Sequence, residues 1–360
     1  GDSWSQVASL PVKPSSVLVA SVVGGKIYVF GSNLGACYDP PTDNWTVIAA
    51  PPNFDAYTSS VEYQNRVYLM GRTTMQVYDP STGNWTTKSS APEPSPKPLE
   101  TNPITGPGTF HGYQAVAVDG KIYRIGGATI GQAYGYLYNE TDVYDPATDS
   151  WSTMAPIPVA VFGYATAVIN NKIYVIGGGI DRNADTATSL VQIFDPSTNK
   201  WSNGPSIPTG VIYPGSCITT GLLAPQRIYI IGGSTAYDWG WQSANSYAVT
   251  KTNLNQAYDP ATETWSSASP LPYANVGPSF VNVGDTLYMV GGTPGNGIAI
   301  VTVEKYIPVG YSPPITIPSP TPSGSIPELP AIAILPFFLI IFAISVTHFR
   351  THRKTSSLKQ

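Results

Sequence analysis

The chain has 360 residues, of which only 11% are charged, and its formal net charge is −4. The last thirteen residues contain four basic side chains and no acid, so residues 1–347 carry a net charge of −8. Such a surface repels a phosphate backbone, which argues against nucleic acid as a partner. Glycine (34) and proline (35) are abundant, as are tyrosine (23) and tryptophan (8), and this composition predicts short strands and turns rather than long helices.

Six short apolar runs recur along the chain, from "GKIYVFG" at residue 25 to "DTLYMVGG" at residue 285. Each follows a turn residue, contains β-branched and aromatic side chains and ends in glycine, as a β-strand does. Apolar residues occupy successive positions, so both faces of these strands are predicted to be buried. Their tyrosines are Tyr28, Tyr68, Tyr123, Tyr174, Tyr229 and Tyr288.

A second signature follows the first five runs, as in "YDPPTDNW" and "YDPATETW". The aromatic residue ends one strand, Asp-Pro begins a tight turn, and the tryptophan lies in the next strand. A further extended segment precedes each tyrosine-bearing strand, which gives four strands per unit, named a to d. The tryptophans of strand d are Trp4, Trp45, Trp85, Trp151, Trp201 and Trp265.

The sixth unit has Tyr306 in the aromatic position but no following turn or tryptophan. Its missing strand is predicted to come from the N-terminus, where "GDSWSQV" supplies Trp4. Six four-stranded sheets arranged radially form a β-propeller, and a blade shared by both ends closes the ring.

These motifs, an apolar run ending in Gly-Gly, then an aromatic residue, then tryptophan, resemble the kelch repeat. The resemblance covers about residues 1–308 and implies an all-β fold, a six-bladed kelch-type propeller closed by the N-terminal strand. Units 1 and 2 depart from it, with a single Gly31 and Gly71 in place of the doublet, which affects their local turn but not the count of six units.

The lengths of the connections predict which face binds a partner. The aromatic residue and the tryptophan are seven residues apart in all five complete turns, whereas the interval from strand-b tyrosine to strand-c aromatic ranges from 10 to 29 residues. The connections from strand d to strand a also vary. Both variable connections emerge at the same end of an antiparallel sheet, so that face is the predicted binding surface.

Aromatic residues are frequent in two of these connections. Their side chains would suit stacking on sugar rings or a protein hot spot, or would instead pack the loops onto the disc. In the fourth unit, Asp181 and Arg182 are further candidates, and "DRNAD" alternates oxygen ligands without the glycine and glutamate of a calcium loop. The aromatic candidates are Tyr134, Tyr136, Tyr237, Trp239, Trp241 and Tyr247.

Arg124 is a further candidate because it replaces the aliphatic residue of the other five strand-b runs. Its side chain is expected either to reach an acid near the channel or to extend to solvent from an ordinary strand position.

Catalytic motifs are missing from the sequence. The only histidines are His111, His348 and His352, too few for the copper site of kelch-type oxidases, and Cys37 and Cys217 show no metal-ligand spacing. No nucleophile, zinc or phosphate-binding motif appears. We therefore expect no cofactor or metal, and a binding protein rather than an enzyme, although a sugar epimerase using arginine and glutamate stays open.

The C-terminal part predicts a membrane anchor. Residues 309–328 form a Pro/Ser-rich stalk, 329–347 an apolar span of borderline length, and 348–360 a basic tail that the positive-inside rule places in the cytoplasm. This order resembles anchoring or sorting signals of prokaryotic, especially archaeal, surface proteins. Three sequons, at Asn44, Asn84 and Asn139, fit an exported glycoprotein.

The predicted function is a cell-surface recognition module, with an extracellular propeller and a single C-terminal membrane span. Its partner is expected to be a surface glycan or an extracellular protein, bound on the face remote from the membrane. Two alternatives stay open: a carbohydrate-active enzyme at the mouth of the central channel, or an architectural envelope component that self-associates.

Overall fold

The computed structural model describes residues 2–15, 17–54, 58–71, 74–93, 109–130, 135–180, 187–236, 250–294 and 300–313. The chain divides into two units, Gly1–Pro313 and Pro314–Gln360, and every described residue belongs to the first. The predicted membrane span and tail, and the stalk beyond residue 313, lie outside the described residues. Within the described part of the chain, no helix is long and apolar enough to cross a membrane.

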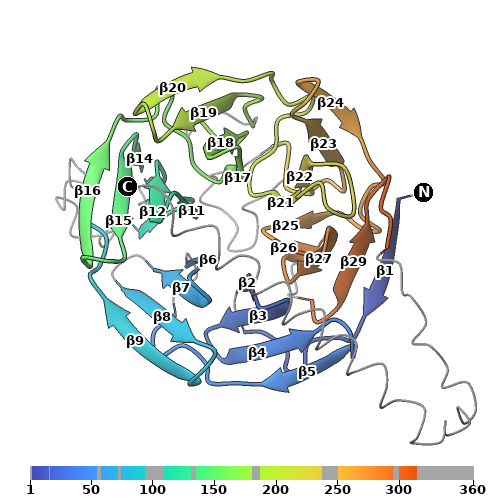
Figure 1. Cartoon of the computed structure of the whole chain (residues 1–360). Coiled ribbons are helices and arrows are strands. Elements are labelled where there is room, and N and C mark those ends of the chain that lie inside the picture. Colours follow the sequence, from blue (N-terminus) through green and yellow to red (C-terminus); the bar gives the residue numbers. More distant parts are fainter. Residues whose placement is uncertain are drawn as a thin grey trace, which may run out of the picture. The chain divides into compact units, whose positions relative to one another are not determined.

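Six four-stranded antiparallel sheets are arranged radially around a central axis (Figure 1), which confirms the predicted six-bladed propeller. Blade 1 contains β2 (Val19–Val23), β3 (Lys26–Gly31), β4 (Leu34–Asp39) and β5 (Asn44–Val47); blade 2 contains β6 (Ser59–Tyr63), β7 (Arg66–Met70), β8 (Met75–Asp79) and β9 (Asn84–Lys88); blade 3 contains β11 (Gln114–Val118), β12 (Lys121–Ile125), β15 (Thr141–Asp145) and β16 (Ser150–Met154). Blade 4 contains β17 (Ala165–Ile169), β18 (Lys172–Ile176), β19 (Val191–Asp195) and β20 (Lys200–Asn203); blade 5 contains β21 (Gly215–Thr219), β22 (Arg227–Ile231), β23 (Asn255–Asp259) and β24 (Thr264–Ser267); blade 6 contains β26 (Ser279–Val283), β27 (Thr286–Val290), β29 (Val303–Ile307) and β1 (Ser3–Val7).

The N-terminal strand closes blade 6, as the sequence predicted. β1 pairs antiparallel with β29, and Trp4 lies opposite Tyr306. The two rings stack with centroids 4.8 Å apart, and the carboxylate of Asp2 accepts a hydrogen bond from the Tyr306 hydroxyl at 2.9 Å. Strands from both ends of the propeller sequence therefore share one sheet.

Strand b of every blade is largely buried, because it lies between strands a and c and each face of the sheet packs against a neighbouring blade. Ile27, Ile122 and Leu287 are fully buried in β3, β12 and β27. Apolar clusters formed from adjacent blades fill the spaces between the sheets. This agrees with the unbroken apolar runs in the sequence.

The six strand-d tryptophans join each blade to its neighbour. Every indole N–H donates a hydrogen bond of 2.8–3.2 Å to a carbonyl in the linker that leaves the preceding blade. The same ring stacks on the strand-c aromatic of its own blade, with centroids 4.8–5.2 Å apart. We call these six hydrogen bonds the tryptophan latches: Trp4–Ser269, Trp45–Ala8, Trp85–Ala49, Trp151–Ser89, Trp201–Ala155 and Trp265–Pro205.

The Gly-Gly doublets mark a close approach between blades. Both glycines of the doublet at Gly177 and Gly178 have positive φ, and the N–H of Gly178 donates to the carbonyl of Val211 in the next linker at 2.8 Å. A Cβ on Gly177 would lie 2.6 Å from that carbonyl oxygen, so a side chain would force the linker away. Blade 1 needs no glycine doublet for such an approach, because its b–c connection is a two-residue turn between Gly31 and Leu34.

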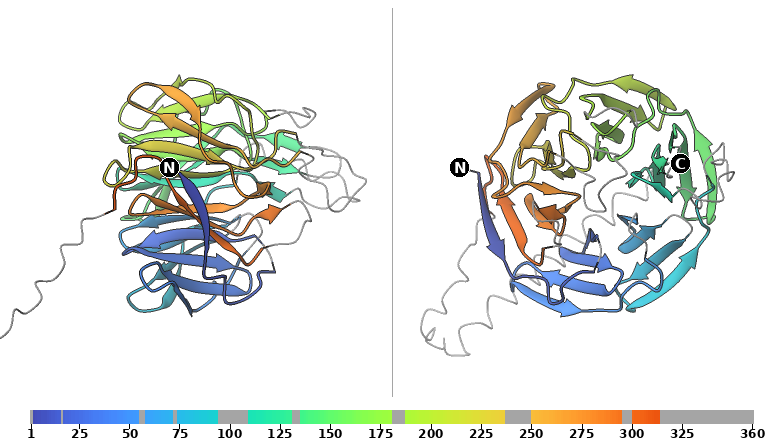
Figure 2. Two further views of the ribbon diagram at one scale, coloured as in Figure 1. Left: turned by 90° about the vertical axis from the view of Figure 1, so that its right-hand side faces the viewer. Right: turned by 180° about the vertical axis from the view of Figure 1, so that it is seen from behind.

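The variable connections emerge on one face of the disc, here called the long-loop face, and the a–b and c–d turns on the other, the tight-turn face. Three further strands lie on blade 3: β10 (Thr109–His111), β13 (Ala128–Ile130) and β14 (Gly135–Leu137). β13 and β14 stand at the right of the side view (Figure 2, left). A short pair, β25 (Asn275–Val276) and β28 (Thr293–Pro294), lies in blade 6, and the sequence analysis predicted none of these five strands.

The described chain ends on the tight-turn face. The N–H of Ser312 donates at 2.7 Å to the carbonyl of Leu223, which lies in the a–b turn of blade 5. The described part of the chain therefore ends opposite the long-loop face.

Candidate functional site

The beginnings of the six a strands surround a cavity of about 310 Å³ at the mouth of the central channel. Strand a is the inner edge of each blade, and each a strand contacts the next, so the six close a ring around the channel. The cavity lies at the long-loop end of these strands, because they begin where the d–a connections arrive. The segments lining it are residues 17–20, 58–60, 112–115, 164–166, 213–216 and 277–280.

A series of backbone hydrogen bonds links blades 3 to 6 at this mouth. The N–H of Gly163 donates to the carbonyl of Gly112, that of Tyr213 to Gly163, and that of Gly277 to Tyr213, at 2.5–2.9 Å. Each of these residues stands two positions before its a strand and has a positive φ. The left-handed conformation lets the N–H of one residue donate to one neighbouring blade while its carbonyl accepts from the other, as at Gly163 and Tyr213.

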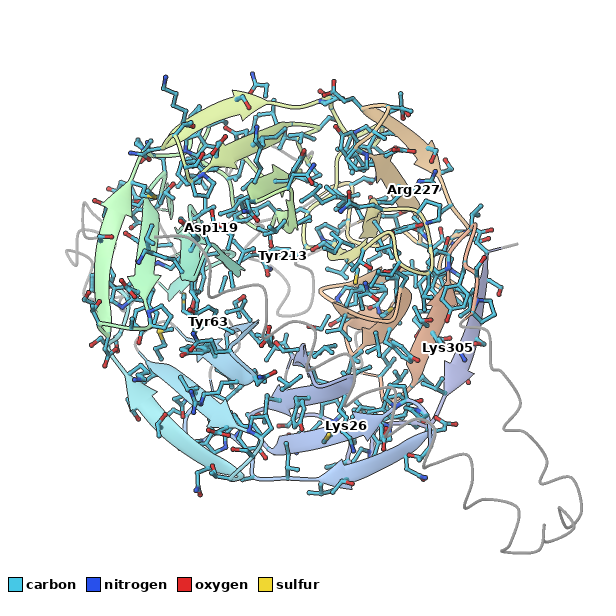
Figure 3. The ribbon with its side chains drawn as sticks, in the orientation of Figure 1. Lys26, Tyr63, Asp119, Tyr213, Arg227 and Lys305 are labelled. Atoms are coloured by element: carbon cyan, nitrogen blue, oxygen red, sulfur yellow. The ribbon has the colours of Figure 1, made fainter. Side chains whose placement is uncertain are left out.

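Tyr213 is the exception in this series, because it holds a φ of 50° where the other three positions have glycine. A tyrosine pays steric strain in that conformation, and such outliers concentrate at functional sites. Its half-buried ring lies over Gly163, where an added Cβ would be 2.9 Å away, and meets Phe162 edge-on with centroids 6.2 Å apart. Figure 3 shows Tyr213 beside the channel.

Hydroxyl groups satisfy the peptide groups that the inner edge strands leave unpaired. In blade 1, the N–H of Ala20 donates to the hydroxyl of Ser279 at 3.1 Å, and its carbonyl accepts from Ser60 at 3.0 Å. The Ser216 hydroxyl donates to the carbonyl of Thr166 at 2.8 Å. Each hydroxyl keeps further hydrogen-bonding capacity for a ligand.

The described residues that line the cavity carry no charged side chain. Their polar groups are serine, threonine and tyrosine hydroxyls and the amide of Gln114. Burial raises the pKa of Tyr164, so this hydroxyl stays protonated and donates to the carbonyl of Ile125. Such a lining suits hydrogen bonding and ring stacking rather than binding by opposite charge.

Arg124 lies inside blade 3 and is not part of this cavity. Its side chain is 3% exposed, and its guanidinium contacts the Asp142 carboxylate of β15 at 2.5 Å. It also donates to the carbonyl of Pro92 at 2.6 Å and lies 5.9 Å from the ring centroids of Tyr113 and Trp151. Burial raises the pKa of Asp142, and the adjacent guanidinium opposes that shift. The acid that Arg124 reaches is therefore within its own blade, and the side chain does not extend to solvent.

The equivalent positions in blades 4 and 5 explain why Arg124 and Asp142 are paired in blade 3. In blades 4 and 5 the position of Asp142 is occupied by Gln192 and Gln256, whose amides each make two hydrogen bonds to the backbone of the incoming linker, at Val159 and Thr209. In blade 3 the shorter Asp142 cannot do this, and Arg124 reaches the linker in its place. Arg124 thus belongs to the scaffold.

Most of the candidate residues lie outside the described part of the chain. These are Tyr134, Asp181, Arg182 and the four aromatic candidates of the segment 237–249. Tyr136 lies in β14, half-buried against the apolar cluster between blades 2 and 3. Tyr138, in the same connection, is 3% exposed and hydrogen-bonded to Thr129. For these two residues the structure agrees with the alternative that the aromatic side chains pack the loop onto the disc.

The sequence analysis missed Tyr213 and the cavity. A signal for both was present, because Gly112, Gly163 and Gly277 precede their a strands at the same offset, and Tyr213 occupies that position in blade 5. Cys37 and Cys217 are both free thiols. Across the described ranges, no group of three or more His, Cys, Asp or Glu side chains is placed to hold a metal ion.

Comparison with known proteins identifies the family. The model of the Attractin/LZTR1 β-propeller matches residues 71–306. The chain belongs to the Attractin/LZTR1 β-propeller family. Curated relatives of this family member are kelch proteins, which supports the kelch repeat predicted from the sequence.

Several relatives match about half of the chain. Among them, "Kelch repeat and BTB domain-containing protein 1" of Camelpox virus is 29% identical over 53% of this chain, and "Kelch-like protein 23" of Pongo abelii is 24% identical over 54%. Each match covers 30% of the relative's own length, so this chain spans less than a third of either protein.

Two solved structures share the fold. The structure of YjhT aligns with a TM-score of 0.65 and 17% identity, covering 82% of this chain and 95% of YjhT. A fungal alcohol oxidase in complex with copper aligns with a TM-score of 0.55 and 15% identity, covering 85% of this chain and 76% of the oxidase. At these identities the likeness concerns the fold alone.

Proposed function

We propose that this propeller is a recognition module at a cell surface, which binds a protein or glycan partner on its long-loop face and is anchored through its C-terminal segment. Kelch-type propellers commonly serve as protein-binding scaffolds. The observation that carries the proposal is the uncharged cavity at the channel mouth. Tyr213 lines this cavity and has a strained backbone conformation.

The direction of the chain supports the anchored arrangement. Pro313 lies on the tight-turn face, and the apolar segment 329–347 follows it in the sequence. A stalk that begins there leaves the long-loop face accessible to a partner outside the cell. Protease digestion of intact cells tests this arrangement, because it should remove the propeller and leave a membrane-bound C-terminal fragment. A propeller that is protected until the membrane is broken would contradict it.

Binding is tested with the full chain against panels of neutral and acidic glycans and of surface proteins. With an identified ligand, Tyr213→Gly should weaken binding by about tenfold or more, because it removes the ring and keeps the backbone conformation. Leu222→Ser is the control, since Leu222 is 83% exposed on the tight-turn face. The Trp239 and Trp241 alanine variants test the blade 5 connection in the same assay. Unchanged binding in Tyr213→Gly would place the site elsewhere.

The same panels distinguish the two rival functions. Turnover of a sugar by the full chain would support the carbohydrate-active enzyme. Self-association into regular arrays without ligand binding would support the architectural component.

A further inference from the structure

A groove of about 440 Å³ lies between blades 2 and 3 on the tight-turn face, opposite the channel mouth. One face of the blade 2 sheet forms its floor, and Pro146 and Ala147 of the blade 3 c–d turn form the facing wall. It extends from Tyr63, at the inner a–b turn, to Lys88, on the outermost strand β9. Figure 3 shows Tyr63 between these two blades.

The groove contains a sequon. Asn84 and Thr86 of "NWT" both line it, and both are exposed, whereas Trp85 between them points to the other side and makes a tryptophan latch. An oligosaccharide attached to the Asn84 amide nitrogen would therefore begin inside the groove. The enzyme that recognises the threonine hydroxyl also has access to it.

The remaining lining matches the chemistry of a pyranose ring. The half-buried ring of Tyr63 lies at the inner end, with its centroid 6.1 Å from that of the buried Tyr68, and offers an apolar surface for C–H groups. The amide of Gln64, the hydroxyl of Thr82 and the ammonium of Lys88 can bond to sugar hydroxyls. Between Tyr63 and Asn84 lies the ion pair of Arg66 and Asp79, at 2.9 Å, whose charged groups can also bond to sugar hydroxyls.

Asn44 provides a matched comparison, because "NWT" also begins strand d of blade 1. Strand pairing equates Tyr63 with Val23, and Gln64 and Lys88 with Gly24 and Ile48. Blade 1 thus lacks the inner aromatic ring and both donors. At the third sequon, Asn139 is exposed but the Thr141 side chain is buried, with a relative exposure of 1%.

We propose that Asn84 carries an N-linked oligosaccharide whose sugar rings lie along this groove, packing on Tyr63 and beside the c–d turn of blade 3. An oligosaccharide on Asn44 has no such site and extends into solvent. This inference depends only on the export that the proposed function includes, and not on ligand binding at the long-loop face.

The test uses the full chain expressed in a eukaryotic host and purified in detergent, with site occupancy measured by mass spectrometry of peptides. An endoglycosidase then releases the sugars from the folded protein. We expect release at Asn84 to be about five- to tenfold slower than at Asn44, because the enzyme must first lift the sugar off the aromatic surface. Tyr63→Val, which copies blade 1, should remove this difference, and Tyr63→Phe should keep it.

Two outcomes would overturn the proposal: an unmodified Asn84 in protein that carries sugar on Asn44, or equal release rates at the two sites. Thermal unfolding of each variant before the digestion shows whether Tyr63→Val remains folded. If it does not, the melting temperatures of Asn84→Gln and Asn44→Gln decide. We expect Asn84→Gln to lose about 2 °C more than Asn44→Gln, and an equal loss would overturn the proposal.

Discussion

The outer rim and the channel mouth of this propeller are built from the same six repeats, but they differ in regularity. At the rim, all six tryptophan latches form with nearly the same geometry. At the mouth, the equivalent position is glycine in three described blades and a strained Tyr213 in another. The rim must fit the next blade at every junction, whereas the mouth faces the channel, so its residues can vary without opening the ring.

The largest effect is expected where one blade departs from the scaffold pattern. Arg124→Ala leaves the buried Asp142 carboxylate unpaired and should lower the free energy of unfolding by about 3–5 kcal/mol, measured by urea denaturation. The double variant Arg124→Val, Asp142→Gln copies blade 4, where Val175 lies opposite Gln192, and should recover much of the loss. A single variant as stable as the wild type would show that the pair does not hold blade 3.

Closure of the ring gives the next largest effect. Trp4→Ala removes a stacked ring and a latch from a strand that no covalent connection holds in blade 6, and should cost about 3 kcal/mol. Trp45→Ala removes the same contacts where the chain is continuous on both sides. Hydrogen exchange of residues 303–307 should therefore increase in Trp4→Ala and not in Trp45→Ala. Equal exchange in the two variants would contradict this difference.

Acid should destabilise the tight-turn face at a higher pH than the mouth. The reason is Asp285, whose carboxylate accepts hydrogen bonds from the backbone of the a–b turn of blade 5. Burial raises the pKa of this carboxyl, but the N–H groups of Thr220, Leu223 and Ala224 outweigh it and lower the pKa to about 2. Since this value is below the unfolded one of about 3.9, the stabilisation of about 2 kcal/mol is present above pH 4 and lost as the pH falls to 2.

Asp285→Asn tests this, because it keeps the shape of the side chain without the charge. Its stability should fall less than that of the wild type between pH 4 and pH 2, measured by urea denaturation at each pH. Parallel curves for the two proteins would show that another carboxylate is responsible.

The smallest change in stability is expected at the mouth. Tyr213→Gly relieves a strain of about 1–2 kcal/mol but loses the contact with Phe162, so the two effects nearly cancel. The melting temperature should stay within about 2 °C of the wild type. A large destabilisation would show that Tyr213 serves the scaffold, like the latches.

The same contrast explains what could be predicted from the sequence. The strand-b runs and the pairing of Trp4 with Tyr306 were predictable, because they repeat six times and each copy supports the others. Arg124 was recognised as irregular, but its partner Asp142 is 18 residues away on the adjacent strand, and only the strand register brings them together. Tyr213 was missed because its distinguishing property is a backbone angle, which composition and periodicity do not reveal.

The pairing of β1 with β29 also affects how the molecule is made. Residues 3–7 leave the ribosome before the rest of the propeller, and their partners at 303–307 are synthesised about 300 residues later. Until then, five blades and part of a sixth can assemble, but β1 and the free edge of blade 6 stay unpaired. Unpaired edge strands favour aggregation during this period. Closure is therefore a late step after translation has passed residue 307, and its rate sets how long a chaperone would need to protect the open ring.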